Sequence, residues 1–440
     1  MRFFQLDAHK TTVHREIIGG ITTFAAMAYI LAVNPSILAA SGMDKGALIT
    51  ATALASALMT VLMALLTNYP IALAPGMGIN AYFAFTVCGA MKIPWQGALG
   101  LVFYSGLVFF VLSITGMRQR LLQALPKELK IAITCGIGLF IAFIGLKGGG
   151  VIVSNPATFV TLGDLHQAGP WLVIGGLVFS AVLVQRKVPG AILIGIATVT
   201  ILGFLVESTG ADGKSAPITA LPSAIMAAPA SLKPTFLQLD LRYFWQHWQQ
   251  CVPIVLALLF VDLFDNMGTL IGVCQRAGLL DSNGNLPRIE RALTADAAAA
   301  MVGSALGTST VTSYIESAAG VEAGGRTGLT ALTTAGCFLL ALFFNPLIAI
   351  IPAVATAPAL VIVGVFMMQS VADLDLKDFA KAVPAVVVML TMPLAFSIAE
   401  GIALGMIVYV GFHLGTGRAR SVTPLGYVLA LLCLLHLIFR

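Results

Sequence analysis

Long apolar runs separated by short polar links occupy most of the chain. Many of the runs approach or exceed the roughly 20 residues that a helix needs to cross a bilayer. We therefore predict an all-α polytopic membrane protein with about fourteen transmembrane spans. A further apolar tail, residues 423–439, either spans the membrane or lies in its interface. The predicted spans lie near residues 16–40, 46–68, 74–91, 95–117, 128–147, 170–185, 189–206, 250–274, 291–306, 308–323, 326–345, 348–370, 377–396 and 398–415.

Composition agrees with this class. Of 440 residues, 58% are hydrophobic and 10% are charged, whereas a soluble domain carries about 25% charged residues. The first run is too long for the core of a signal peptide, so we expect it to be retained. The cysteines stand singly in apolar runs without metal-ligand spacing, so we expect packing roles, no metal site and no cofactor. They are Cys88, Cys135, Cys251, Cys274, Cys337 and Cys433.

The net charge of +5 lies in the links between runs and indicates orientation, not nucleic-acid binding. If the N-terminus is cytoplasmic, the loops inside are rich in bases, which the positive-inside rule requires. We predict a multi-pass protein of the plasma or inner membrane with a cytoplasmic N-terminus. The inside bases are Arg118, Arg120, Lys127, Lys130, Arg186, Lys187, Arg276, Arg288, Arg291, Arg418 and Arg420.

Carboxylates interrupt the apolar pattern in one region. Asp262 and Asp265 lie within the apolar run 252–274, and Glu316 ends the hydroxyl-rich stretch GTSTVTSYIE. An acid at membrane depth normally faces a wet cavity, a partner or a substrate, although it can simply hydrogen-bond a neighbouring helix. Asp262 and Asp265 share one helix face, and two such close acids resist joint ionisation, which suits one of them to carry a proton. A sodium site of carboxylate, hydroxyl and carbonyl oxygens remains an alternative.

Two glycine-broken segments hold matching positions. Residues 70–91 and 303–322 are each third in a set of seven spans, and an odd number of spans per half makes the second half inverted. Inverted repeats with short broken segments at matching positions indicate a substrate site near the membrane midplane. The glycines could instead serve close helix packing. Half-helix N-termini at this depth would offer N–H groups to a polar ligand.

The polar groups of these segments suit a planar heterocycle. A carboxylate accepts hydrogen bonds from adjacent N–H donors, and a ring with N–H, amino and carbonyl groups also needs amide and hydroxyl partners. Asn80, Thr312, Ser313 and Glu316 supply this mixture. The region therefore indicates the centre of a transporter.

Several motifs resemble those of the AzgA-like purine permeases, relatives of the uracil and xanthine permeases. The resemblance runs from about Thr12 to the C-terminus and rests on motifs that occur in the family's order. They are TTFAAMAYILAVNP (22–35), APGMGINAYFAF (74–85), FVDLFDNMGTLIG (260–272), GTSTVTSYIESAAGVEAGGRTG (307–328) and APALVIVGVFMMQS (357–370).

The resemblance implies a proton-coupled importer of adenine, guanine, hypoxanthine or xanthine. It implies short antiparallel strands in spans 3 and 10, a core domain (16–117 and 250–345) and a gate domain (128–206 and 348–415). Asp262 and Glu316 match the family's substrate-binding acids, Asn80 matches its span-3 amide, and Asp265 matches the acid that we assign to proton coupling. The roles of Asp262 and Asp265 could be exchanged. Apart from the resemblance, we expect Ala81, Thr312, Ser313 and Tyr314 to contribute to the same substrate site.

Other classes of protein fit the sequence less well. A sulfate-permease-type anion transporter shares the implied fold, but it calls for a basic residue near the site. A membrane enzyme needs a nucleophile–base or metal cluster, and the histidines lie away from the acids. A channel is disfavoured because broken paired repeats imply alternating access. The preferred purine and the oligomeric state, a homodimer among the options, stay open.

Overall fold

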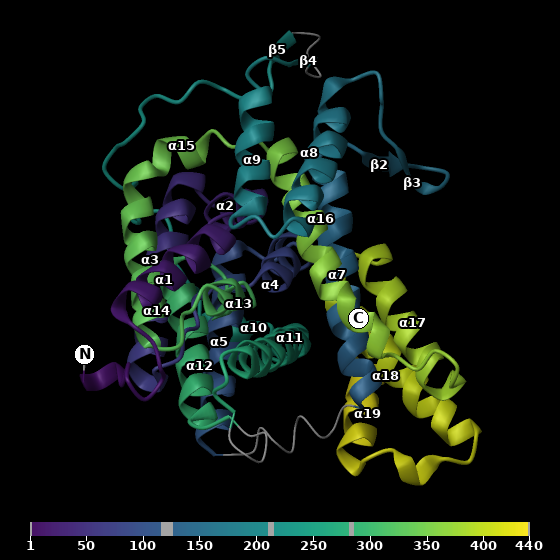
Figure 1. Ribbon diagram of the computed structural model, residues 1–440. Coiled ribbons are helices and arrows are strands. Elements are labelled where there is room, and N and C mark those ends of the chain that lie inside the picture. The colour runs from purple at the N-terminus through teal and green to yellow at the C-terminus, as the bar shows by residue number, and fades with distance from the viewer. Residues whose placement is uncertain (1, 116–125, 210–214, 281–285, 439–440) are drawn as a thin grey trace.

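The computed structural model describes residues 2–115, 126–209, 215–280 and 286–438, and it is largely helical (Figure 1). Up to residue 202 the helices are η1 (Arg2–Phe4), α1 (Val13–Met27), α2 (Ile30–Leu38), η2 (Ala39–Ser41), α3 (Lys45–Thr67), α4 (Met77–Ala81), the π-helix η3 (Tyr82–Ala90), α5 (Trp95–Ile114), α7 (Lys127–Gly148), α8 (Ala168–Gln185) and α9 (Ala191–Leu202).

The rest of the chain continues in the same way. Its helices are α10 (Arg242–Gln246), α11 (Trp248–Arg276), α12 (Ile289–Leu306), α13 (Ser317–Glu322), α14 (Gly328–Ala341), η4 (Leu342–Phe344), α15 (Asn345–Ala349), α16 (Ala353–Met368), η5 (Gln369–Asp373), α17 (Phe379–Leu394), α18 (Ile398–Gly415), η6 (Ala419–Ser421) and α19 (Pro424–Ile438).

Strands are short and form three antiparallel pairs in the described residues. Two pairs are local hairpins in loops, which the hydrophobic pattern does not predict. The third joins two segments that are far apart in the sequence and confirms the strands expected in spans 3 and 10. The pairs are β1 (Leu73–Pro75) with β6 (Val311–Ser313), β2 (Ile152–Asn155) with β3 (Phe159–Leu162), and β4 (Glu207–Thr209) with β5 (Ser215–Pro217).

The apolar runs fold as helices or as broken helical segments. Within the described residues, eight helices are long and apolar enough to cross a membrane, and shorter apolar helices accompany them. The predicted run 308–323 is the most divided, since it holds only β6 and the short helix α13. The chain is therefore an all-helical membrane protein with locally broken spans.

The helices pack in two groups. One group contains α1 to α5 and α11 to α14, and the other contains α7 to α9 and α16 to α19. In Figure 1 the first group lies on the left and most of the second on the right, with α9 at the top centre above α2 and α11 near the junction of the groups. Within the groups, α3 packs on α14, α5 on α12 and α7 on α16. Each group therefore interleaves helices from the beginning and the end of the chain.

The two groups also meet close to the broken segments. Gly78 of α4 faces α7, and a Cβ atom at this position would lie 2.5 Å from Cγ2 of Ile137. The hydroxyl of Thr86 in η3 donates a hydrogen bond to the carbonyl oxygen of Phe396, between α17 and α18. The absence of a side chain at Gly78 thus allows the groups to touch beside β1.

One fully buried acid has a structural role. Glu16 of α1 caps the N-terminus of α14: its Oε2 accepts hydrogen bonds from the hydroxyls of Thr327 and Thr330, both at 2.7 Å. Oε2 also accepts from the N–H groups of the same two threonines, at 3.1 and 3.2 Å, and Oε1 accepts from the N–H of Arg326 at 2.9 Å. A carboxylate with this many donors at a helix N-terminus is well stabilised. Glu16 therefore fastens α1 to α14.

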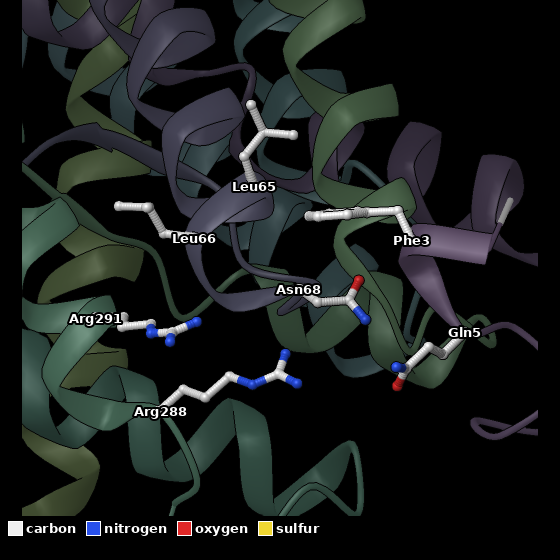
Figure 2. A pocket seen from close by; sticks show the side chains of 7 residues that line it. All are labelled: Phe3, Gln5, Leu65, Leu66, Asn68, Arg288 and Arg291. Atoms are coloured by element: carbon white, nitrogen blue, oxygen red, sulfur yellow. The ribbon is translucent and has the colours of Figure 1, made fainter.

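Three segments meet at one face of the molecule. Nδ2 of Asn68, directly after α3, donates to the carbonyl oxygen of Phe4 at 3.1 Å. Nη1 of Arg288, directly before α12, donates to the carbonyl oxygen of Thr67 at 3.1 Å. The N-terminus, the end of α3 and the start of α12 therefore share a face, and the side chains between them line a pocket of about 310 Å³ (Figure 2).

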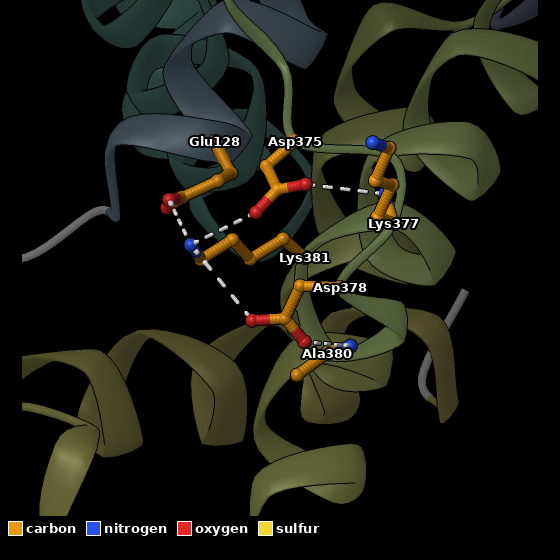
Figure 3. Close-up of polar contacts among 6 residues, drawn as sticks. All are labelled: Glu128, Asp375, Lys377, Asp378, Ala380 and Lys381. Atoms are coloured by element: carbon orange, nitrogen blue, oxygen red, sulfur yellow. Dashed lines mark hydrogen bonds and ion pairs between the residues drawn. The ribbon is translucent and has the colours of Figure 1, made fainter.

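A second polar cluster joins the N-terminal ends of α7 and α17 (Figure 3). Nζ of Lys381 lies 3.9 Å from Oε1 of Glu128 and 3.8 Å from Oδ2 of both Asp375 and Asp378. All four side chains are partly exposed, so each pair contributes little to stability. The cluster places the starts of α7 and α17 at the same face.

Candidate functional site

The candidate site is built around the antiparallel pair β1–β6. Ala74 lies opposite Thr312, and the ladder is extended by the N–H of Gly76 bonding to Thr310 at 2.9 Å and the N–H of Tyr314 bonding to Ala72 at 3.0 Å. The paired strands are buried. Non-helical backbone is tolerated at membrane depth only where protein or water satisfies it. The two broken segments satisfy each other, and they are held together as a result.

Each strand leads directly into a helix. Gly76 connects β1 to α4, which continues into η3 as one apolar segment, Met77–Ala90. Tyr314 and Ile315 connect β6 to Glu316, which immediately precedes α13. Both helices therefore begin beside the strand pair. Ile315 is 45% exposed and Glu316 is partly exposed, in contrast to the buried strands.

Glu316 is held by a tyrosine from the first helical segment. Tyr29 lies where the first span is interrupted, between α1 and α2, and it is fully buried. Its hydroxyl donates a hydrogen bond of 2.5 Å to Oε1 of Glu316. A hydrogen bond to an ionised carboxylate is short and strong. Tyr29 therefore orients the carboxyl group of a residue that, taken as a whole, is partly exposed.

Asn80 belongs to a buried amide and hydroxyl network. Its Nδ2 donates to Oδ1 of Asn34 at 2.7 Å, and its Oδ1 accepts a bond from the hydroxyl of Ser309. Asn34 in turn donates to the hydroxyls of Thr52 at 2.7 Å and Thr308 at 3.0 Å. These side chains are at most marginally accessible. The network links α2, α3 and α4 to the segment that precedes β6.

The residues of β6 are tied to neighbouring elements. Ser313 donates to Oδ1 of Asp296, on α12, from its N–H at 3.0 Å and from its hydroxyl at 3.3 Å. The hydroxyl of Tyr314 donates to the carbonyl oxygen of Pro75 at 2.5 Å. Thr312 is fully buried, and its hydroxyl meets no hydrogen-bond partner among the described residues. Two of these three predicted site residues thus stabilise the strand pair.

The long helix α11 carries the remaining acids past the strand pair. It packs against β6 and α13, and the side chain of Asp262 on it is 2% exposed. Asp265, the predicted coupling acid, lies on the same helix, but its side chain is outside the described part of the structure. Asn266 is fully buried, and neither polar atom of its amide meets a hydrogen-bond partner in the described residues.

The structure thus gathers most of the predicted residues around one strand pair. Ala81 and Asn80 are buried in α4, and Thr312 to Glu316 lie on or just after β6. The sequence interpretation gave no role to Tyr29, Asn34, Asp296 or Asn266. Tyr29 and Asn34 lie in the motif TTFAAMAYILAVNP. Asn34 could have been predicted to have a role, because it is a polar side chain in an apolar stretch. Tyr29 could not have been recognised in this way, because aromatic residues are common in apolar stretches.

Comparison with known proteins identifies the class. Residues 14–404 match the model of the Permease family that is named for xanthine and uracil permeases. A putative permease of Methanocaldococcus jannaschii is 48% identical over 100% of this chain and 98% of its own length. The guanine/hypoxanthine permease PbuG of Bacillus subtilis is 44% identical over 99% of both chains. The adenine permease AdeP of Escherichia coli is 41% identical over 100% of this chain and 96% of its own.

Solved structures agree on the fold. The transmembrane domain of the bicarbonate transporter BicA of a cyanobacterium superposes with a TM-score of 0.66 at 16% identity, covering 88% of this chain and 96% of that one. The murine anion transporter Slc26a9 in its inward-facing state gives a TM-score of 0.62 at 12% identity, covering 91% of this chain and 68% of that one.

These matches define a membrane transporter. The chain belongs to the Permease family, and its resemblance to the AzgA-like purine permeases is confirmed. The interpretation as a transporter and not an enzyme is confirmed by the same match.

Proposed function

We propose that this permease imports purine nucleobases, namely adenine, guanine, hypoxanthine or xanthine, in symport with protons. Glu316 and Asp262 would accept hydrogen bonds from the ring and amino N–H groups of the purine. Thr312, Ser313, Tyr314, Ala81 and Asn80 would shape the site around it. Support for a purine comes from the names of the related guanine/hypoxanthine and adenine permeases.

One observation carries the proposal. Glu316 is partly exposed, directly follows the strand pair that joins the two broken spans, and is oriented by Tyr29. Glu16, by contrast, is enclosed by protein donors and has no exposed surface. An acid at membrane depth with exposed surface and a fixed orientation is suited to a ligand. Glu316 is therefore the acid for which a substrate role has the most direct support.

Proton coupling is assigned to Asp265. It lies three residues after Asp262 on α11, so the two sequence positions fall on one face of the helix. In a site of low dielectric, a proton on one of them relieves the repulsion between two negative charges. Loading and release of that proton would then be linked to movement of the substrate. Coupling to sodium is the alternative. The two are distinguished by whether uptake depends on the proton gradient or on external sodium.

The proposed architecture has fourteen spans in two inverted halves, with a core domain (16–117 and 250–345) and a gate domain (128–206 and 348–415). Two contacts support the count. The N-terminus, the end of α3 and the start of α12 share one face, and α7 and α17 also begin at a common face. Each relation requires an even number of membrane crossings between the segments that meet, and the predicted span positions give an even number in each case. The bases in the predicted inside loops support a cytoplasmic position for the face that carries the N-terminus.

Uptake of a panel of radiolabelled nucleobases tests the proposal. The chain is expressed in a host that lacks its own nucleobase permeases, and a Glu316→Gln variant serves as the inactive control. Saturable uptake of at least one purine by the wild type, lost in the variant, is expected. Uptake of bicarbonate or sulfate in place of purines would instead support the anion transporters that share this fold.

A further inference from the structure

The pocket on the N-terminal face lies apart from the proposed substrate site. Its lining combines two arginines from the start of α12, Arg288 and Arg291, with Leu65 and Leu66 near the end of α3 and Phe3 from η1. Figure 2 shows both arginine side chains reaching in the same direction, toward Asn68, while the leucines and Phe3 lie on the other side. The pocket therefore has a cationic part beside an apolar part.

The arginines of the cationic part have N–H donors that could bind an anion. Arg288 uses Nη1 to bond the carbonyl oxygen of Thr67, which is one of the five N–H donors of its guanidinium group. Arg291 is exposed, and within the described residues neither arginine takes part in an ion pair. Two guanidinium groups that approach one space suit a phosphate group, which accepts paired N–H bonds.

The apolar part indicates that this anion has a hydrocarbon portion. Leu65 is 50% exposed, Leu66 is 37% exposed and Phe3 is 56% exposed. Leu65 and Leu66 lie in the last turn of an apolar helix that is long enough to span the membrane, where the acyl region gives way to head groups. A soluble anion would gain nothing from these side chains, whereas an acyl chain would bury them.

Charge and location agree on the source of the ligand. The pocket shares its face with the N-terminus, which is the face that the basic loops assign to the cytoplasm. The cytoplasmic leaflet carries anionic lipids, and basic pockets between helices on this side suit their head groups. The volume of about 310 Å³ accommodates a phosphoglycerol head group, with the acyl chains continuing over Leu65 and Leu66.

We propose that the pocket formed by Phe3, Leu65, Leu66, Asn68, Arg288 and Arg291 binds the head group of an anionic glycerophospholipid from the cytoplasmic leaflet. The bound lipid links the N-terminus, the end of α3 and the start of α12. These segments belong to the group of helices that carries the proposed substrate site, so the lipid stabilises that group.

Native mass spectrometry of the purified full-length chain tests this. The probes are phosphatidylglycerol and phosphatidylcholine with identical acyl chains, and the test variant is Arg288→Gln with Arg291→Gln. Arg418→Gln with Arg420→Gln is the matched control, because it removes the same charge from another loop on the predicted cytoplasmic side. The wild type and the control are expected to retain phosphatidylglycerol in preference to phosphatidylcholine. The test variant is expected to bind phosphatidylglycerol on the order of tenfold more weakly.

Three results would overturn the proposal. These are equal retention of the two lipids by the wild type, an equal loss in the test and control variants, and arginine-dependent binding of inorganic phosphate or glycerol phosphate as tight as that of phosphatidylglycerol. The last result would identify a soluble-anion site. Because Arg288 also caps α3, the single variant Arg291→Gln is measured as well. It should weaken phosphatidylglycerol binding without changing the elution profile of the protein.

Discussion

The hydroxyl of Tyr29 donates a 2.5 Å hydrogen bond to Oε1 of Glu316, although the two residues are 287 positions apart in the sequence. Tyr29 lies between α1 and α2, and Glu316 directly follows the strand segment β6–Ile315 that precedes α13. The bond therefore joins two interrupted helices at the site where the proposed substrate binds. Glu316 is oriented before any ligand arrives, which lowers the entropic cost of binding.

Tyr29→Phe should weaken purine transport moderately while the fold is retained. The change removes only the hydroxyl, and a typical hydrogen bond contributes about 0.5–1.5 kcal/mol, or more to a charged group. We expect the KM for the purine to rise about three- to tenfold. Tyr104→Phe is the control, because it removes an exposed hydroxyl that donates to the carbonyl oxygen of Leu241 and accepts from Nε1 of Trp245. An unchanged KM in Tyr29→Phe would show that Glu316 does not need this partner.

Glu316→Gln should abolish or severely reduce purine uptake while the protein still reaches the membrane. The amide keeps the size of the side chain but replaces an acceptor oxygen by a donor, so a ligand N–H group is left unpaired. An unmade buried hydrogen bond costs about 1–3 kcal/mol, roughly tenfold or more in affinity. Glu322→Gln is the matched control, because this acid of α13 is exposed and forms an ion pair with the exposed Arg276. Wild-type affinity in Glu316→Gln would assign the acid a structural role.

Asn80→Ala should lower thermal stability as well as uptake. The variant leaves Oδ1 of Asn34 and the hydroxyl of Ser309 without their partner in a buried network, at a cost of about 1–3 kcal/mol. The melting temperature of the purified protein should therefore fall, whereas that of Glu316→Gln should stay close to the wild type. If the melting temperature of Asn80→Ala equals that of the wild type, the amide of Asn80 binds the ligand but does not stabilise the fold.

Asp262→Asn and Asp265→Asn should separate binding from coupling. The first variant is expected to lose equilibrium binding of the purine. The second should bind the purine and catalyse counterflow but fail to accumulate it, because an amide cannot cycle a proton. Binding and counterflow are measured on both purified variants. If Asp262→Asn binds the purine normally and Asp265→Asn does not, Asp265 is the binding acid and Asp262 the coupling acid.

Uptake by the wild type should rise as the external pH falls below neutral and should collapse with a protonophore. A coupling acid must load a proton from outside before the substrate-bound state moves, so a higher proton concentration favours the loaded form. Initial rates across a pH series, with and without protonophore, give the answer. Uptake that resists the protonophore but depends on external sodium would identify sodium, and not the proton, as the coupling ion.

Much of the fold could be predicted from the sequence because the bilayer leaves few options. Every predicted span contains helical structure. The paired strands were expected from the resemblance to the AzgA-like permeases, and they lie in the two glycine-broken segments. Backbone groups must be satisfied locally in lipid, so apolar length alone predicts helices. The hairpins β2–β3 and β4–β5 were not predicted, because they lie in loops outside the bilayer, where this constraint does not act.

By itself the sequence determined the class of protein, the helical character of its apolar runs and the acids that interrupt them. Only the tertiary structure decided what each polar group does. Glu16 of α1 caps α14, and Tyr29 donates a hydrogen bond to Glu316. Asn80 forms a buried hydrogen-bond network with Asn34 and Ser309. Helical period and apolar length are local properties, but a hydrogen-bond partner more than two hundred residues away is chosen by how the helices pack. A buried polar side chain must find such a partner because lipid provides none.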